Sequence, residues 1–278
     1  MDHCESTFKG SGALDLYFQS WRPATGREPK ASLLVVHGVG EHSGRYDNVV
    51  NWFVPKRYAV YAFDLRGHGR SPGARGHVNR FDEFKEDVRA FLAVVSSKEP
   101  GRPVFMVAHS LGGLIGLYTV LHDPSGLAGI VASGPLLGQV PVSPALLTLA
   151  KLMSRVWPSL TMKTGLDVTA LSRDQAVVDA YVSDPLVHDL SSARLGTEIM
   201  AAIDWTQAHA AELNLPLLIV HGGADRLCQC EASGRFFEQV KFPDRDRCEY
   251  EGYYHEVFND IGKERVLADV EAWLGARC

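Results

Sequence analysis

The chain has 278 residues, a formal net charge of −5 and basic residues spread along its length. This charge distribution argues against a nucleic-acid surface, and we expect no nucleic-acid partner. No apolar run approaches transmembrane length and the N-terminus does not resemble a secretory signal, so we expect a cytoplasmic protein, with peripheral membrane contact left open. The five cysteines lack C-x-x-C spacing, which argues against a disulfide framework or a zinc site; they are Cys4, Cys228, Cys230, Cys248 and Cys278.

The first 30 residues predict an antiparallel pair of strands, at 7–9 and 14–21, separated by the turn Gly10-Ser11-Gly12. Residues 31–133 then alternate between short apolar runs, typical of buried parallel strands, and amphipathic segments, typical of helices. The expected strands are 33–36, 59–63, 104–108 and 129–132, and the expected helices are 81–97 and 113–122. This alternation predicts an α/β fold with a mostly parallel central sheet and helices on both faces.

Residues 134–214 interrupt the alternation. Strand-like runs vanish, several helical segments take their place, and prolines stand at positions 135, 141, 144, 158 and 185. Strands are expected again at 216–220 and 247–250. We therefore expect a core made of residues 1–133 and 215–278, with residues 134–214 inserted as a helical cap over the active edge of the sheet.

The first part of this insertion, residues 140–160, is apolar over a surface too wide for a single buried stripe. One interpretation is that this helix packs on the core and on neighbouring helices. The other is that it lines an acyl-chain tunnel and turns an outer face to a micelle or bilayer, flanked by Lys151, Arg155 and Lys163. Its apolar residues are Val142, Ala145, Leu146, Leu147, Leu149, Ala150, Leu152, Met153, Val156, Trp157 and Leu160.

The pentapeptide Ala108-His109-Ser110-Leu111-Gly112 lies between an apolar strand and a helix. A serine on such a sharp turn is held out from the edge of the sheet, as in the nucleophile elbow of serine hydrolases. Small residues are needed around it, because the strand and the helix come close together there. The usual pattern is G-x-S-x-G, and this chain has Ala108 in place of the first glycine.

A serine hydroxyl needs a base to take its proton and a carboxylate to orient that base. Asp225 follows the strand 216–220 and His255 follows the strand 247–250, which places both at the same sheet edge as Ser110. The order Ser, Asp, His is the one this fold uses. Asp225 could instead cap a helix that begins near Cys230, and His255 could be an ordinary loop histidine. Other candidates for these roles are Asp204, His188, His209 and His221.

An oxyanion hole must offer N–H groups to the negative charge that develops on the substrate carbonyl. The strand 33–36 is followed by the turn His37-Gly38-Val39-Gly40, from which one donor is expected. The second donor comes from the residue after the nucleophile. We predict that the backbone N–H groups of Val39 and Leu111 form the hole, and that the reaction needs no metal or organic cofactor.

Several motifs together resemble the monoacylglycerol lipase family of α/β-hydrolases. They are HGVGEHSGRY at 37–46, DLRGHGRS at 64–71, the elbow at Ser110, SDPL at 183–186, ADRLC at 224–228 and Tyr254-His255. The resemblance implies the α/β-hydrolase fold and the hydrolysis of one fatty acyl ester from a glycerol monoester. It implies the triad Ser110, Asp225 and His255 for this reaction.

The same resemblance implies that Glu41, Arg45 and Tyr181 shape the glycerol end of the site. An ordinary salt bridge between Glu41 and Arg45 is the simpler interpretation of that pair. Cys228 could line the pocket or could be a small buried residue. The expected partner is a lipid ester substrate, and the sequence does not predict an oligomeric state.

Two other functions stay open at this point. A lysophospholipase or a broad carboxylesterase would use the same catalytic residues beneath a different cap. A non-catalytic binding protein with the hydrolase fold belongs to another class, and the complete Ser-Asp-His set disfavours it, because a binding protein has no need of all three groups.

Overall fold

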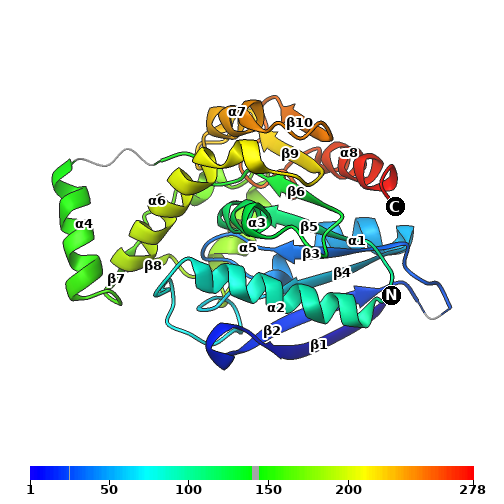
Figure 1. The fold of residues 1–278 in the computed structure, drawn as a ribbon, viewed down its shortest axis with the longest axis horizontal. Coiled ribbons are helices and arrows are strands. Elements are labelled where there is room, and N and C mark those ends of the chain that lie inside the picture. Colours follow the sequence, from blue (N-terminus) through cyan, green and yellow to red (C-terminus); the bar gives the residue numbers. More distant parts are fainter. Residues whose placement is uncertain (25, 140–143) are drawn as a thin grey trace.

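A computed structural model of the protein describes residues 1–24, 26–139 and 144–278. Its centre is a sheet in the strand order β1-β2-β4-β3-β5-β6-β9-β10 (Figure 1). β1 pairs with β2 and β2 pairs with β4 in antiparallel register, and the remaining neighbours are parallel. The strands are β1 (Asp2–Lys9), β2 (Asp15–Arg22), β3 (Ala31–Val36), β4 (Tyr58–Phe63), β5 (Val104–His109), β6 (Gly129–Ser133), β9 (Leu217–Gly222) and β10 (Arg245–Tyr250).

The α-helices of the described residues are α1 (Asp47–Phe53), α2 (Asp82–Lys98), α3 (Leu111–His122), α4 (Pro144–Val156), α5 (Gln175–Ser183), α6 (Ala193–Ala208), α7 (Cys230–Gln239) and α8 (Lys263–Gly275). α2 illustrates how the local sequence favours these elements. Asp82 and Glu83 stand in its first turn and Lys98 in its last, where their charges complement the helix dipole. Within the described ranges, no helix combines the length and the apolar character that crossing a membrane requires.

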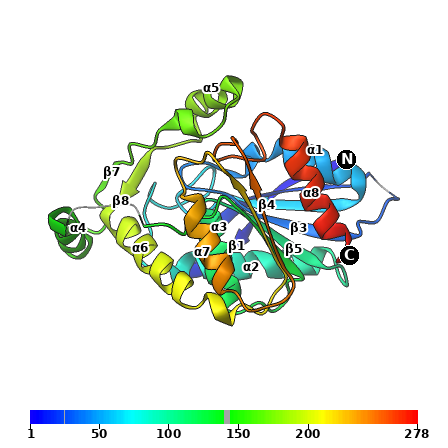
Figure 2. The ribbon, with the colours of Figure 1, turned by 90° about the horizontal axis from the view of Figure 1, so that it is seen from above.

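Alternate residues of the central strands divide the core into two layers. In β3, Leu34 and Val36 pack with the layer that contains α2 and α3, whereas Leu33 and Val35 pack with α1 and α8. Figure 2 shows α2 on one side of the sheet and α1 and α8 on the other. β3, β4 and β5 are buried along their whole length, as expected for parallel strands covered on both faces.

The predicted α/β fold and the antiparallel start are confirmed. β1 is longer than expected because it is an edge strand whose side chains are exposed except for Phe8, so most of it carries no apolar signal. The expectation that strands vanish in residues 134–214 is wrong in one place. β7 (Thr161–Lys163) and β8 (Leu190–Ser192) form a small antiparallel sheet, and three residues each are too few to show an alternating pattern.

The apolar helix is shorter than predicted. α4 covers Pro144–Val156, and the expected start at 140–143, with Val142, lies outside the described residues. α4 stands at the outer edge of the molecule beside α6 (Figures 1 and 2). Its contact with α6 is partly polar, because the buried Ser154 hydroxyl lies 2.9 Å from Thr197 Oγ1 and Arg194 donates to the Ser154 carbonyl at 2.7 Å. Its large apolar side chains Leu149, Leu152 and Val156 are exposed instead.

The closest approach of helix to sheet occurs at the start of α3. A Cβ added to Gly112 would collide with the backbone carbonyl oxygens of Val36 and His37. One turn later, a Cβ on Gly116 would lie 3.0 Å from the Ala108 side chain. The alanine that replaces the first glycine of the usual elbow pattern is therefore accommodated because the facing helical residue is a glycine.

We predict that Gly112→Ala destabilises the protein by about 3 kcal/mol, because the new methyl group meets backbone atoms that cannot move aside without shifting β3. Gly196→Ala in α6 is the matched control, since its Cβ meets nothing within 4 Å, and it should stabilise the helix by roughly 0.5–1 kcal/mol. Urea unfolding of both variants measures the difference. Equal stabilities of Gly112→Ala and wild type would contradict the close approach.

Candidate active site

Ser110 occupies the turn between β5 and α3 with φ 54° and ψ −119°. A non-glycine residue at positive φ is strained and persists only where its surroundings hold it. Here the Ser110 N–H donates to the Ser133 carbonyl at 3.0 Å, while the Ser110 carbonyl accepts from the N–H groups of Leu114 and Leu136 at 3.1 and 3.0 Å. The backbone therefore has the geometry of a nucleophile elbow, and Ser110 lines a cavity at the carboxyl edge of the sheet.

Asp225 and His255 are joined by a short hydrogen bond in the same region. His255 Nδ1 lies 2.7 Å from Asp225 Oδ2, and the Asp225 side chain has no exposed surface. Asp225 Oδ1 accepts the N–H groups of Leu227 and Cys228 at 2.8 and 2.9 Å. Asp225 thus holds its own loop rather than capping α7, whose N-cap residue is Gln229.

The contact between Asp225 and His255 shifts the pKa values of both side chains. Burial alone would raise the pKa of the Asp225 carboxyl, but His255 and the hydrogen bond from His221 hold it well below its usual range. Burial of the His255 imidazole works against its charged form, and the Asp225 carboxylate outweighs that effect, so the pKa of His255 lies above its ordinary value. Asp225 is therefore an anion that orients His255 and stabilises its protonated form.

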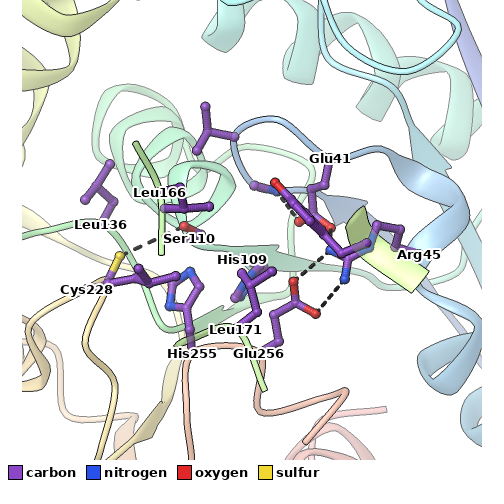
Figure 3. Close-up of a pocket in the computed structure, with 14 residues that line it drawn as sticks. Glu41, Arg45, His109, Ser110, Leu136, Leu166, Leu171, Cys228, His255 and Glu256 are labelled. Atoms are coloured by element: carbon purple, nitrogen blue, oxygen red, sulfur yellow. Dashed lines mark hydrogen bonds and ion pairs between the residues drawn. The ribbon is translucent and has the colours of Figure 1, made fainter. Parts of the chain in front are cut away.

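Ser110 and His255 face the same cavity without a hydrogen bond between them in the described structure (Figure 3). Ser110 Oγ lies 3.9 Å from Cys228 Sγ instead. Catalytic hydrogen bonds of this kind are often long in the absence of substrate and shorten when it binds. Cys228 lines the cavity, and burial raises the pKa of its thiol, so the reactive thiolate is scarce at neutral pH.

The turn at 37–40 lies directly against the serine. A Cβ on Gly38 would stand 3.1 Å from Ser110 Cβ, which shows how near the two backbones are. Leu111 is the first residue of α3, where N–H groups have no partner within the helix. Within the described residues, the N–H groups of Val39 and Leu111 have no hydrogen-bond acceptor. Both N–H groups can therefore donate to an oxyanion, and their role as the oxyanion hole stays a prediction.

The three residues expected at the glycerol end, Glu41, Arg45 and Tyr181, all line the cavity. Glu41 Oε1 accepts from the Gly38 N–H at 2.7 Å, and Glu41 Oε2 accepts from Arg45 at 2.8 Å. Burial raises the pKa of Glu41, but Arg45 reverses this and lowers it to about 2. Glu41 therefore forms the salt bridge with Arg45 that the sequence suggested. Its other oxygen holds the Gly38 N–H, and so holds the predicted oxyanion turn in place.

Sequence reasoning missed Glu256. Its carboxylate binds Arg45 with both oxygens, at 2.7 and 2.9 Å, and it lines the cavity beside His255 (Figure 3). The Asn259 side chain donates to the same carboxylate at 2.8 Å. The only available signal was its position next to the predicted base.

His109 was also missed as a pocket residue. Its ring lies 4.6 Å from that of His255, centroid to centroid, and it lines the cavity. Burial, and then the nearby His255, lower the pKa of His109 to about 4. His109 is therefore neutral near pH 7 and does not compete with His255 for a proton.

Of the alternative candidates, none lines the cavity in the described structure. Asp204 binds Gln139, and His209 stacks on Trp205. His188 donates its backbone N–H to the Gly40 carbonyl at 2.9 Å and so holds the predicted oxyanion turn. His221 does not line the cavity either, but it contacts the predicted triad. Its Nε2 lies 3.1 Å from Asp225 Oδ2, the same carboxylate oxygen that His255 contacts.

The cavity has a volume of about 160 Å³. Its lining has an apolar part, here called the apolar wall, and a charged part made of Glu41, Arg45 and Glu256; Figure 3 shows Leu136 on one side of the cavity and Glu41 and Arg45 on the other. Leucines from four separate segments make the apolar wall, and none of the α4 side chains described reaches it; these leucines are Leu136, Leu166, Leu171 and Leu227. For the described part of α4, the interpretation that it lines an acyl-chain tunnel is therefore wrong for this cavity.

The chain is similar to known proteins over most of its length. The model of the serine aminopeptidase S33 family matches residues 27–262. The chain is 36% identical over 272 residues to a monoacylglycerol lipase of Mycolicibacterium smegmatis, which covers 97% of this chain and 96% of the relative. It is 33% identical over 267 residues to the human monoglyceride lipase, covering 94% of this chain and 87% of that protein.

Among solved structures, the crystal structure of the Paleococcus ferrophilus monoacylglycerol lipase superposes with a TM-score of 0.86. It shares 34% sequence identity, and the match covers 95% of this chain and 99% of that chain. Sequence and structure thus agree along nearly the whole length. The chain belongs to the serine hydrolase family that the S33 model describes, and within it to the monoacylglycerol lipase family of α/β-hydrolases.

Proposed function

We propose that this protein hydrolyses monoacylglycerols to a fatty acid and glycerol, with Ser110 as nucleophile, His255 as base and Asp225 as the residue that orients the base. The observation that carries the proposal is the 2.7 Å contact of His255 Nδ1 with the buried Asp225, because His255 and the strained Ser110 line the same cavity. The similarity to monoacylglycerol lipases over most of the chain supports the choice of substrate.

The mechanism has two acyl-transfer steps. His255 Nε2 takes the proton of Ser110 Oγ as that oxygen attacks the ester carbonyl, and the N–H groups of Val39 and Leu111 bind the resulting oxyanion. When the intermediate collapses, the bond to the glycerol oxygen breaks and His255 gives its proton to that oxygen. Water then attacks the acyl-enzyme in the same way and releases the fatty acid.

The two walls of the cavity divide the substrate between them. The leucine wall suits the start of the acyl chain, and Glu41, Arg45 and Tyr181 suit the hydroxyl groups of glycerol. In this proposal residues 134–214 form a cap over a core of residues 1–133 and 215–278. The N–H groups of His255 and Glu256 donate to the carbonyls of Ala170 and Leu171, which ties the catalytic loop to the cap.

We further propose that α4 places the protein on a membrane surface, where its substrate is found. Leu149, Leu152 and Val156 recur along one side of α4, and Val156 is 73% exposed. Trp157 directly after the helix is 58% exposed. Lys151 and Arg155 are also exposed on α4. An exposed apolar stripe with cations beside it is the pattern of a helix that lies in a bilayer interface.

We expect fatty-acid release from long-chain monoacylglycerol to exceed that from a lysophospholipid, a triacylglycerol and a short-chain ester. Ser110→Ala should abolish release from all four while leaving the unfolding transition intact, because it removes only one oxygen atom. A preference for the short ester would point to a general carboxylesterase. Release by Ser110→Ala near the wild-type rate would show that another residue is the nucleophile.

The pH dependence follows from the raised pKa of His255. The base must be neutral to accept a proton, so kcat/KM should fall as the pH drops through the His255 pKa, with a midpoint above about 6.5. Asp225→Asn removes the charge that raises this pKa. That variant should lose about 10⁴ in kcat, and its midpoint should move to lower pH. A midpoint that stays in place would mean that another carboxylate controls His255.

We expect Leu152→Glu to weaken binding to vesicles of phosphatidylcholine and phosphatidylglycerol by about tenfold or more, because burial of a leucine in the bilayer is lost. Ile261→Glu is the matched control, since Ile261 is equally exposed, at 56%, but lies outside α4. Cosedimentation measures both variants. Equal binding of Leu152→Glu and Ile261→Glu would contradict membrane contact through α4.

A further inference from the structure

Arg45 is the one cationic side chain among the described residues that line the cavity, and both of its Nη atoms already donate to carboxylates of the protein. Its Nη1 donates to Glu41 and to Glu256, and its Nη2 donates to the second oxygen of Glu256. The guanidinium also lies over the Tyr181 ring, 4.6 Å from the centroid. The fork formed by Nη1 and Nη2, which would otherwise bind a phosphate or a carboxylate with two hydrogen bonds, is thus filled by Glu256.

The charges around the cavity do not balance. Glu41 and Glu256 face one Arg45, which leaves one negative charge on the polar wall. Asp225 adds a further negative charge behind His255 whenever that histidine is neutral. His109 contributes no positive charge near pH 7, because burial lowers its pKa to about 4.

These charges act at short range. The exposed fractions of the Glu41, Arg45 and Glu256 side chains are 5%, 10% and 4%. Solvent therefore screens these charges weakly. The excess carboxylate charge repels an anionic group brought into the cavity more strongly than it would at the protein surface.

We propose that Glu256 makes this site selective against anionic head groups, so that it accepts neutral monoacylglycerols and rejects lysolipids that carry a phosphate on the glycerol. This selectivity rests on the proposed monoacylglycerol hydrolysis and adds a residue that determines its substrate class. Glu256 acts in two ways: it contributes the unbalanced charge, and it occupies the Arg45 fork that would bind the phosphate.

The same charge favours release of the product. Hydrolysis of the acyl-enzyme by water generates a fatty-acid carboxylate next to Ser110, where the substrate ester was neutral. The Glu256 and Glu41 carboxylates repel this anion but not the ester that replaces it. A fatty acid should therefore inhibit the enzyme more weakly than an uncharged fatty alcohol of the same length.

The test compares octanoylglycerol with octanoyl lysophosphatidic acid, which share the ester and the acyl chain and differ in the phosphate. Wild type should strongly prefer octanoylglycerol. In Glu256→Gln, the kcat/KM for octanoylglycerol divided by that for octanoyl lysophosphatidic acid should be about tenfold lower than in wild type. Glu238→Gln on α7 makes the same charge change at an exposed position outside the cavity, and it should leave the ratio unchanged. Equal use of the two substrates by wild type, or an unchanged ratio in Glu256→Gln, would overturn the proposal.

A second measurement does not depend on monoacylglycerol. Octanoate and octanol are compared as inhibitors of the hydrolysis of a chromogenic butyrate ester by wild type and by Glu256→Gln. Octanoate should be the weaker inhibitor of wild type, and only octanoate should gain potency in the variant. Failure of wild type to cleave octanoylglycerol would refute the proposed function alone, whereas equal inhibition of wild type by octanoate and octanol would refute the charge selectivity, even if Glu256→Gln does not fold.

Discussion

The close approach of α3 to β3 and β5 is the constraint on which the rest of the site depends. Gly112 has no side chain because the carbonyl oxygens of Val36 and His37 occupy that space. The same turn holds Ser110 at positive φ and leaves the N–H of Leu111 at the open end of the helix. One contact between helix and sheet thereby positions the proposed nucleophile, a proposed donor to the oxyanion, and the strand end from which the 37–40 turn leaves.

The parallel sheet then brings the remaining groups to the serine. β9 and β10 end at the same edge as β5, so Asp225 and His255 arrive from loops that are 30 residues apart in sequence. Four hydrogen bonds satisfy the Asp225 carboxylate, two from backbone N–H groups and two from the histidines His255 and His221. A buried carboxylate held in this way keeps both its charge and its orientation, which the imidazole needs.

The sequence predicted the features that rest on local patterns. Apolar strands, the elbow around Ser110 and the positions of Asp225 and His255 after their strands all follow from short motifs. The link between Arg45 and Glu256 could not be predicted, because it joins residues 211 positions apart through side chains alone. The orientation of α4 could not be predicted either, because its apolar composition is compatible both with packing on the core and with an outward face. In the structure Ser154 faces α6, and Leu149 and Leu152 are exposed.

The two proposed lipid contacts have opposite charge preferences, and this difference gives them separate roles. Lys151 and Arg155 on α4 favour an anionic bilayer surface, whereas the cavity carries an excess of carboxylates. A buried ion network costs desolvation free energy that its salt bridges only partly recover, so stability is a poor reason for placing Glu256 there. Selectivity is a better one, because an enzyme drawn to anionic membranes meets many anionic lipids, and an anionic cavity keeps them out of the active site.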